Sequence, residues 1–337
     1  MKQRIVIAGG SGFLGRVLAK KLAACNYHVV VLTRSPRNDT KRIRQLHWDG
    51  RLMGDWAAAL DGALAVVNLA GRSVNCRYHA RNRREILESR VNSTRVLGEA
   101  IERCSKPPRV WLNASTATIY KHTFGPAWDE SGEIGGTPEA KDEFSVEVAR
   151  AWERAFFSEG TAATVGEASR LSLTSKDGDR RDACPTVRKV ALRMAMVLGA
   201  EKGSVFPVLR RLVRFGLGGK MGSGEQYVSW IHEEDFCRAI EWLLDHDDGS
   251  GPVNVAAPNP IPNREMMRTL RAVCRAQFGQ PATRWMLEVG AFFLRTETEL
   301  IIKSRRVVPE RLLNAGFEFR FSKMEDAMRE IESRIHS

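Results

Sequence analysis

Three glycines near the N-terminus recur at intervals of three residues, as Gly9-x-x-Gly12-x-x-Gly15. They lie between the apolar run 4–8 and apolar residues at helical spacing over 13–22, which predict a strand and a helix. In such a turn the first glycine permits the bend, the second lets a pyrophosphate approach the backbone, and the third lets helix and strand pack closely. Unpaired N–H groups at the helix start then face the phosphates. We therefore predict a dinucleotide site whose turn consists of Gly9, Gly10, Ser11, Gly12, Phe13, Leu14 and Gly15.

The end of the second predicted strand, 28–32, bears on which dinucleotide would bind. An NAD site usually has an acidic residue there, about 20 residues after the turn, which bonds the ribose 2′-hydroxyl. Here Thr33 and Arg34 follow the strand, and the next acid is Asp39. A guanidinium offers a bidentate fork to a 2′-phosphate. We therefore expect Thr33 and Arg34 to belong to an NADP(H) site; the alternative is that Arg34 is a solvated surface arginine.

The elements that must position this site alternate between strand and helix. Buried β-branched runs predict strands, and apolar residues at a period of 3.6 predict helices. Such alternation favours an α/β fold of Rossmann type, a doubly wound parallel sheet. The predicted strands are 4–8, 28–32, 64–69, 110–113 and 187–198, and the predicted helices are 13–22, 92–101 and 145–157.

The composition changes after Ala257, where the run PNPIPN marks a domain junction. We expect an NADP(H)-binding domain over 1–257 and a smaller, mostly helical C-terminal substrate domain over 258–337. The polar run 158–186 is predicted to be an inserted surface loop, and 200–226 to contribute to a substrate cleft. The helices expected in the second domain are 264–278, 286–294 and 322–335.

The overall composition is that of a globular protein. The chain has 337 residues, 43% hydrophobic and 27% charged. It contains no apolar run long enough to span a membrane and begins without a secretory signal pattern. The six cysteines form no C-x-x-C pair, so we expect no metal site and reduced thiols in a cytoplasmic protein.

The formal net charge of +12 is concentrated in four segments: 34–51, 72–95, 202–220 and 303–320. Clustered positive charge favours an anionic partner, either a phosphorylated small molecule or a nucleic acid. Nucleic acid is disfavoured because no helix-turn-helix, zinc-finger or RNP signature accompanies the charge. We expect 34–51 to serve a 2′-phosphate and 202–220 to face the cleft. The expected partner is a small-molecule substrate, and a homodimer is compatible with the sequence.

Four segments together resemble the extended short-chain dehydrogenases/reductases. Besides the glycine turn they are Asn68-Leu-Ala-Gly71, Asn113-Ala-Ser-Thr-Ala-Thr-Ile-Tyr120 and Ser229-Trp-Ile-His-Glu-Glu-Asp235. The resemblance implies that Leu69, Ala70, Gly71 and Ser115 contact the cofactor. It also implies that Thr116 supplies a hydroxyl to the substrate oxygen.

Three further segments resemble one atypical branch, the YfcH/SulA-like epimerase family proteins. They are 89–95 (SRVNSTR), 217–224 (LGGKMGSG) and 306–317 (RVVPERLLNAGF). The last resembles a C-terminal domain of unknown function that is typical of this branch. The branch is named by its fold, so the resemblance implies a nucleotide-binding domain and a substrate domain but no particular substrate.

Active members of the wider family use a Tyr-x-x-x-Lys pair for proton transfer, and this chain has none. Residues four positions after its four tyrosines are Val, Asn, Phe and Ile. Alignment on neighbouring segments places Phe144 and Val148 where the pair would be. A phenyl ring cannot transfer a proton, so the candidate catalytic groups are Thr116 and Tyr120. The alternatives are that Tyr120 packs in the core and that Thr116 caps the end of its strand. Arg193, Lys220 and His232 are candidates for the substrate cleft, and the alternative for His232 is a structural contact with the helix that it precedes.

Two functions follow from this pattern, and a third is weaker. The first is an NADP(H)-dependent oxidoreductase or epimerase-like enzyme acting on an unknown carbonyl or nucleotide-sugar substrate. The alternative is a catalytically weak NADP(H)-binding protein that regulates or senses redox state. The third is binding of nucleic acid or a protein partner by the basic segments.

Overall fold

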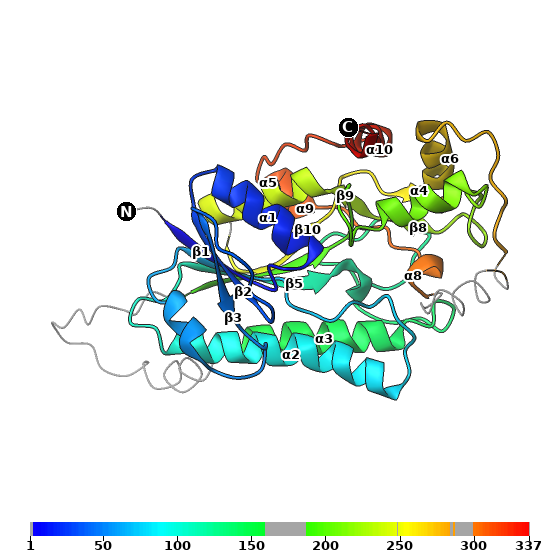
Figure 1. Cartoon of the computed structure of the whole chain (residues 1–337). Helices are drawn as coiled ribbons and strands as arrows, with labels where there is room; N and C mark the ends of the chain where they lie inside the picture. Colours follow the sequence, from blue (N-terminus) through cyan, green and yellow to red (C-terminus); the bar gives the residue numbers. More distant parts are fainter. Residues whose placement is uncertain (1–2, 159–186, 248, 284–285, 287–298, 337) are drawn as a thin grey trace.

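A parallel β-sheet of seven strands forms the centre of the molecule (Figure 1). The computed structural model describes residues 3–158, 187–247, 249–283, 286 and 299–336. The strand order is β10-β6-β5-β4-β1-β2-β3, and every neighbouring pair is parallel. The strands are β1 (Arg4–Ala8), β2 (His28–Thr33), β3 (Ile43–His47), β4 (Ala65–Asn68), β5 (Val110–Thr116), β6 (Arg188–Met194) and β10 (Gly251–Val255).

Helices cover both faces of the sheet, which confirms the predicted doubly wound α/β fold. α1 (Phe13–Ala24) and α5 (Glu233–Asp245) cover one face, and α2 (Ala80–Glu102) and α3 (Glu143–Ser158) cover the other (Figure 1). Strand β1 shows why: Ile5 and Ile7 pack toward α1 and α5, whereas Val6 packs toward α2 and α3. Successive side chains of a strand point to opposite faces, so a continuous apolar run requires two layers of helix.

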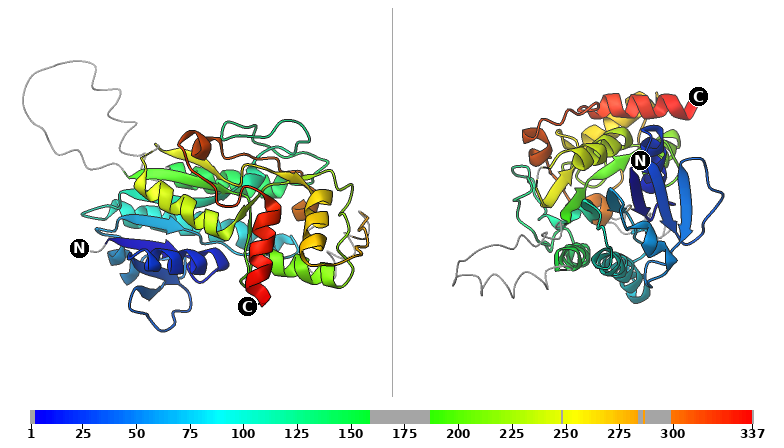
Figure 2. Two further views of the ribbon diagram at one scale, coloured as in Figure 1. Left: turned by 90° about the horizontal axis from the view of Figure 1, so that it is seen from above. Right: turned by 90° about the vertical axis from the view of Figure 1, so that its left-hand side faces the viewer.

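Later parts of the chain form a third core beside the sheet. It is built mainly by α4 (Phe206–Arg214), α6 (Asn263–Val273) and α10 (Met324–His336), with α10 against α6 (Figure 2). Leu312, in α9 (Glu310–Asn314), and Phe317 instead join the core under α1 and α5. The remaining elements are the 3-10 helices η1 (Asp55–Ala59) and η2 (Ala117–Ile119), strands β7 (Met196–Leu198), β8 (Tyr227–Val228), β9 (Trp230–His232) and β11 (Ile261–Pro262), and α8 (Glu299–Ile302).

Several boundaries differ from those predicted. The helix expected over 92–101 begins at Ala80, because its polar first half lacks the apolar spacing on which the prediction relied. The strand expected over 187–198 is divided at Ala195, where β7 leaves the main sheet to pair with β9. The predicted insertion 158–186 and helix 286–294 lie almost wholly outside the described residues. No helix of the described ranges combines the length and hydropathy needed to cross a bilayer.

A buried polar network joins the carboxyl ends of the strands to α3. Arg193 of β6 donates Nε and Nη2 to the two carboxylate oxygens of Glu153 on α3, both at 2.9 Å. The side chains are only 5% and 11% exposed. Arg193 Nη1 donates to Tyr120 Oη at 2.9 Å, and Tyr120 donates to Asn254 Oδ1 of β10 at 2.8 Å. The network therefore joins α3, β6 and β10, and the charges of Arg193 and Glu153 in it pair with each other.

This network yields a stability prediction. Arg193→Met or Glu153→Met alone should lower the free energy of unfolding by about 3–5 kcal/mol, because each leaves one buried charge without its partner. The double substitution should cost less than the sum of the two, since no charge is then stranded. Urea unfolding of the four proteins measures these differences.

The control is the exposed pair of Lys121 and Glu133, whose side chains are 43% and 57% exposed. Lys121→Met should change stability by less than about 1 kcal/mol. Additive losses at Arg193 and Glu153 would show that the two charges are not coupled as described.

Candidate active site

The glycine turn brings three parts of the chain into close backbone contact. Gly9 has φ +76°, and a Cβ there would lie 2.8 Å from Ala70 Cα in the loop after β4. A Cβ on Gly15 would lie 2.4 Å from Gly10 Cα. Side chains at these positions would push α1 and the loop after β4 away from the turn. The turn therefore requires glycine for packing, as a dinucleotide-binding turn does.

The start of α1 is left open to a ligand. Gly12 is its N-cap and provides no side-chain cap, and the first turn has no acidic residue. Helix N-terminal N–H groups carry partial positive charge and lack partners within the helix. A phosphate placed there would be stabilised by these groups.

A cavity of about 480 Å³ opens beside the turn, at the carboxyl ends of the strands. It is bounded by the turn, the loop after β4, the end of β5, one face of α3 and residues 203–205. It gathers nine of the predicted cofactor residues: Gly9, Gly12, Phe13, Leu14, Gly15, Leu69, Ala70, Gly71 and Ser115. Gly10 and Ser11 belong to the turn but do not line the cavity. Ligand sites of open parallel sheets lie at this edge, which makes this cavity the candidate active site.

A wider depression of about 850 Å³ lies at the opposite edge of the sheet. It is lined by residues at the amino ends of the strands, including Arg4, His28 and Arg109. Neither the glycine turn nor any candidate catalytic residue reaches it. Its volume therefore does not make it the better candidate.

Thr33 and Arg34 lie at the carboxyl end of β2, next to the turn, because Gly9 N donates to Leu32 O at 3.0 Å. Thr33 is buried, and its Oγ1 accepts from Ser35 N at 3.4 Å. Arg34 is exposed and makes no hydrogen bond or ion pair within the described part of the chain. Neither residue lines the 480 Å³ cavity, so both would meet only a ligand that extends beyond it.

Two hydroxyl groups stand at the end of β5. Thr116 lines the cavity, and its Oγ1 accepts from Thr118 N at 3.1 Å. That bond leaves the hydroxyl proton of Thr116 available to a ligand. Ser115 instead donates its proton to Glu153 Oε1 at 2.6 Å, which makes its oxygen an acceptor only.

The wall formed by α3 contains no group that titrates. Phe144 and Val148, one helical turn apart, both line the cavity. The Phe144 ring packs edge-on against Tyr78, with centroids 5.1 Å apart. Tyr78 also lines the cavity, on the segment before α2. The sequence did not predict Tyr78 as a cavity residue, because its position depends on how the segment before α2 folds over α3.

Tyr120, predicted as a candidate catalytic phenol, does not reach the cavity. Its side chain is 1% exposed, and its hydroxyl is held between Arg193 and Asn254. Burial raises the pKa of Tyr120 to about 12. The expectation is corrected: Tyr120 is part of the buried network and not a proton donor to the cleft.

The three residues expected in the substrate cleft also lie elsewhere. Arg193 is buried, and its guanidinium is occupied by Glu153, Tyr120 and the carbonyl of Glu130. His232 is the N-cap of α5: its Nδ1 accepts from Glu234 N at 3.0 Å. Its Nε2 lies 2.9 Å from Glu330 Oε2. Burial lowers the pKa of His232, as expected of a structural imidazole.

Lys220 is exposed on a loop that is fastened along its length. Gly219 N donates to Gln280 O at 3.1 Å, and Gly222 N donates to Ala282 O at 2.8 Å. A Cβ on Gly219 would lie 2.4 Å from the backbone of Gln280. The glycines of this loop therefore permit close packing of two chain segments, and Lys220 does not line the cavity.

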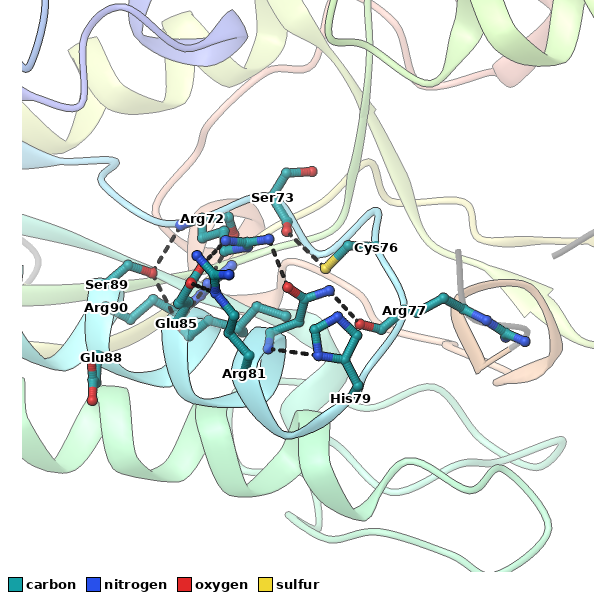
Figure 3. Close-up of polar contacts among 12 residues, drawn as sticks. Arg72, Ser73, Cys76, Arg77, His79, Arg81, Glu85, Glu88, Ser89 and Arg90 are labelled. Atoms are coloured by element: carbon teal, nitrogen blue, oxygen red, sulfur yellow. Dashed lines mark hydrogen bonds and ion pairs between the residues drawn. The ribbon is translucent and has the colours of Figure 1, made fainter. Parts of the chain in front are cut away.

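The charged cavity residues Arg72 and Arg90 were also missed by the sequence analysis (Figure 3). Arg90 lies on α2 four residues from the buried Ile86 and Thr94. A charged residue at that spacing falls on the apolar face of the helix. This phase, together with the basic excess of 72–95, is the signal that could have identified it.

Comparison with known proteins places the chain among proteins of the same architecture. Residues 5–138 match the NAD dependent epimerase/dehydratase family, and residues 282–331 match a domain of unknown function, DUF1731. The epimerase family protein YfhF of Bacillus subtilis is 28% identical over 97% of both chains. The human epimerase family protein SDR39U1 is 28% identical over 97% of this chain and 99% of its own.

A crystal structure of human SDR39U1 (isoform 2) with NADPH superposes with a TM-score of 0.79. Its sequence is 26% identical, and the match covers 98% of this chain and 99% of that one. This chain is thus similar over nearly its whole length to YfhF and SDR39U1, and it matches the NAD dependent epimerase/dehydratase family in its N-terminal part and DUF1731 near its C-terminus.

Proposed function

We propose that this protein binds NADP(H) and acts as an atypical extended short-chain dehydrogenase/reductase on a carbonyl or nucleotide-sugar substrate. The observation that carries the proposal is the 480 Å³ cavity beside the uncapped start of α1. It offers helix N–H groups to phosphates and a cleft of small-molecule size beside them. The likeness to human SDR39U1, crystallised with NADPH, supports the choice of cofactor.

The residues present fit such a cofactor. Side chains on Gly9 or Gly15 would overlap neighbouring backbone, so the turn keeps the close backbone surface that a pyrophosphate needs. Arg34 stands at the end of β2 with its guanidinium exposed, where it can pair with a 2′-phosphate. When bound, NADP(H) would supply hydride transfer.

Proton transfer must then come from groups other than Tyr and Lys on α3. Phe144 and Val148 exclude water from that wall but cannot donate or accept a proton. Thr116 is a hydroxyl that lines the cavity and keeps its proton free. We assign Thr116 the task of holding the substrate oxygen, with the proton supplied through it or by water.

The apolar α3 wall also favours a second candidate function. A protein that retains the cofactor cleft and lacks the acid–base pair suits a role as an NADP(H)-dependent regulator or redox sensor. NADPH consumption with a panel of carbonyl compounds and nucleotide sugars separates the two. Turnover supports an enzyme, and tight NADPH binding without turnover supports the regulator.

The first prediction for this function concerns cofactor preference. NADPH should bind at least tenfold more tightly than NADH, about 1.4 kcal/mol or more, because Arg34 can pair with the 2′-phosphate. Arg34→Asp should narrow or reverse that preference by placing a carboxylate there. Fluorescence titration with both nucleotides measures it. The control is Arg95→Asp, the same charge change on the exposed side of α2. Equal wild-type affinities would contradict the assignment of Arg34.

The second prediction concerns the missing pair. Wild-type protein should reduce simple carbonyl compounds very weakly while binding NADPH normally. Phe144→Tyr alone should restore little, because an unassisted phenol has a pKa near 10. Adding Val148→Lys should raise turnover, since a cation one helical turn away lowers the phenol pKa. The measurement is NADPH oxidation by the wild type, both single variants and the double variant. Strong wild-type turnover that survives Thr116→Val would show that the reacting groups are elsewhere.

A further inference from the structure

The charged side chains that line the cavity are all positive among the described residues. Among the residues that the structure describes, its charged lining side chains are Arg72 and Arg90, with no carboxylate, lysine or histidine. The other polar lining groups are neutral, chiefly serine and threonine hydroxyls. The walls therefore carry cations without acids that would neutralise them inside the cavity.

Arg72 is neutralised from outside the cavity. It forms an ion pair with Glu85 of α2, and its Nη2 donates to Asn82 Oδ1 at 2.8 Å (Figure 3). Its backbone N–H donates to Ser89 Oγ at 2.9 Å. Arg81 shares the same carboxylate at 2.9 Å. Arg72 thus fastens the segment 72–79 to α2 and has a counter-ion.

Arg90, in contrast, has no counter-ion among the residues that the structure describes. Its Nη1 donates to the carbonyls of Arg72 at 3.1 Å and Ile86 at 3.0 Å. Its Nε and Nη2 have no acceptor within the described ranges, and no described carboxylate pairs with it. These two nitrogens form one edge of the guanidinium, the edge that accepts two oxygens of a carboxylate or phosphate at once.

The surroundings hold this side chain in one place. Its guanidinium lies over the ring of Trp152 on α3, with Cζ 5.1 Å from the centroid. A Cβ on Gly71 would lie 3.3 Å from Arg90 Cζ, so the loop after β4 packs directly on it. The titratable groups that act on it electrostatically are Tyr78 and Cys76, and neither is a carboxylate. A fixed fork loses little side-chain entropy when a ligand binds.

An unpaired guanidinium here costs stability. Burial lowers the pKa of Arg90 to about 10, so it still carries its charge at neutral pH. An apolar residue on this face of α2 would avoid the desolvation cost of that charge. Packing alone therefore does not account for an arginine at this position.

We propose that the Nε–Nη2 edge of Arg90 binds an oxyanion inside the cavity, in bidentate fashion. This deepens the proposed function and rests on it. The oxyanion is either a phosphate of the nucleotide cofactor or an acidic group of the substrate bound beside it. Both present two oxygens to the same edge.

The experiment compares wild-type protein with Arg90→Gln, Arg90→Lys and Arg84→Gln. Arg84 is exposed on the same helix and does not line the cavity, so its substitution controls for net charge. NADPH affinity is measured by fluorescence titration at several salt concentrations. Inorganic phosphate is then titrated against each NADPH-saturated protein, with the NADPH signal as readout. Urea unfolding shows which variants are folded.

If the anion belongs to the cofactor, Arg90→Gln should weaken NADPH binding at least tenfold and reduce its salt dependence. If the anion belongs to a second ligand, NADPH affinity should be unchanged and the phosphate response should disappear. In either case Arg90→Lys should be intermediate, because lysine keeps the charge but not the fork. Arg84→Gln should stay within twofold of wild type.

Equal NADPH and phosphate binding by folded Arg90→Gln and wild type would overturn the proposal. Failure of the wild type to bind NADPH would instead overturn the proposed function. Phosphate protection of the nucleotide-free protein against unfolding then tests Arg90 alone. Protection lost in Arg90→Gln supports the oxyanion site, and protection equal in both proteins contradicts it.

Discussion

The cleft depends on the buried ion pair between Arg193 and Glu153 and on the hydrogen bonds that extend from it. The same network continues through Tyr120 to Asn254, whose backbone N–H donates to Glu130 Oε1 at 2.9 Å. Asn254 Nδ2 donates to Val308 O at 2.9 Å, which adds the C-terminal segment. Because parallel strands end at one edge, fixing β5, β6 and β10 to α3 also fixes the floor of the cavity. Tyr120 and Arg193, which the sequence suggested as site residues, therefore stabilise the strands that form the floor of the cavity.

The α3 side of the cavity is built differently from the side formed by the glycine turn. The glycine turn, the open start of α1 and the loop after β4 supply the parts that a dinucleotide needs. The face of α3 supplies Phe144 and Val148, which are apolar. Positive charge reaches the cavity from α2 instead, through Arg90. The positive charge of the cavity therefore comes from α2 and not from the face of α3 that holds Phe144 and Val148.

Local patterns predicted most of the sheet, and their limits have physical causes. β1, β2, β4 and β5 are almost wholly buried; the first three contain continuous apolar runs, and β5 begins with one. The edge strands β3 (IRQLH) and β10 (GPVNV) escaped prediction because an edge strand tolerates polar residues, glycine and proline. Long-range pairing escaped it for another reason. Arg193 and Glu153 are 40 residues apart, and no spacing rule connects them.

The residues of the candidate site, like the strands, were predicted only in part. Residues fixed by backbone geometry, such as Gly9 and Gly15, lie where a phosphate-binding turn requires them. Residues chosen by side-chain type, such as Tyr120 and His232, were misplaced because a polar group in a fold may face the core or the cleft. Whether such a side chain faces the core or the cleft depends on its hydrogen-bond partners, which lie on distant segments of the chain. Arg90 is the opposite case: it was not predicted, although its spacing of four residues from Ile86 and Thr94 places it on the apolar face of α2.

The C-terminal segment around Lys303 and Arg305 is bonded to the wall of the cavity through buried charge. Lys303 donates Nζ to Thr118 O at 2.6 Å and pairs with Asp142; both side chains are almost fully buried. Arg305 Nε donates to Thr118 Oγ1 at 3.1 Å, and Thr118 lines the cavity. Swinging this segment away would expose an apolar core and separate a buried ion pair, at a cost of several kcal/mol. Lys303 and Arg305 therefore hold Thr118 in place, and Thr118 lines the cavity two residues after Thr116.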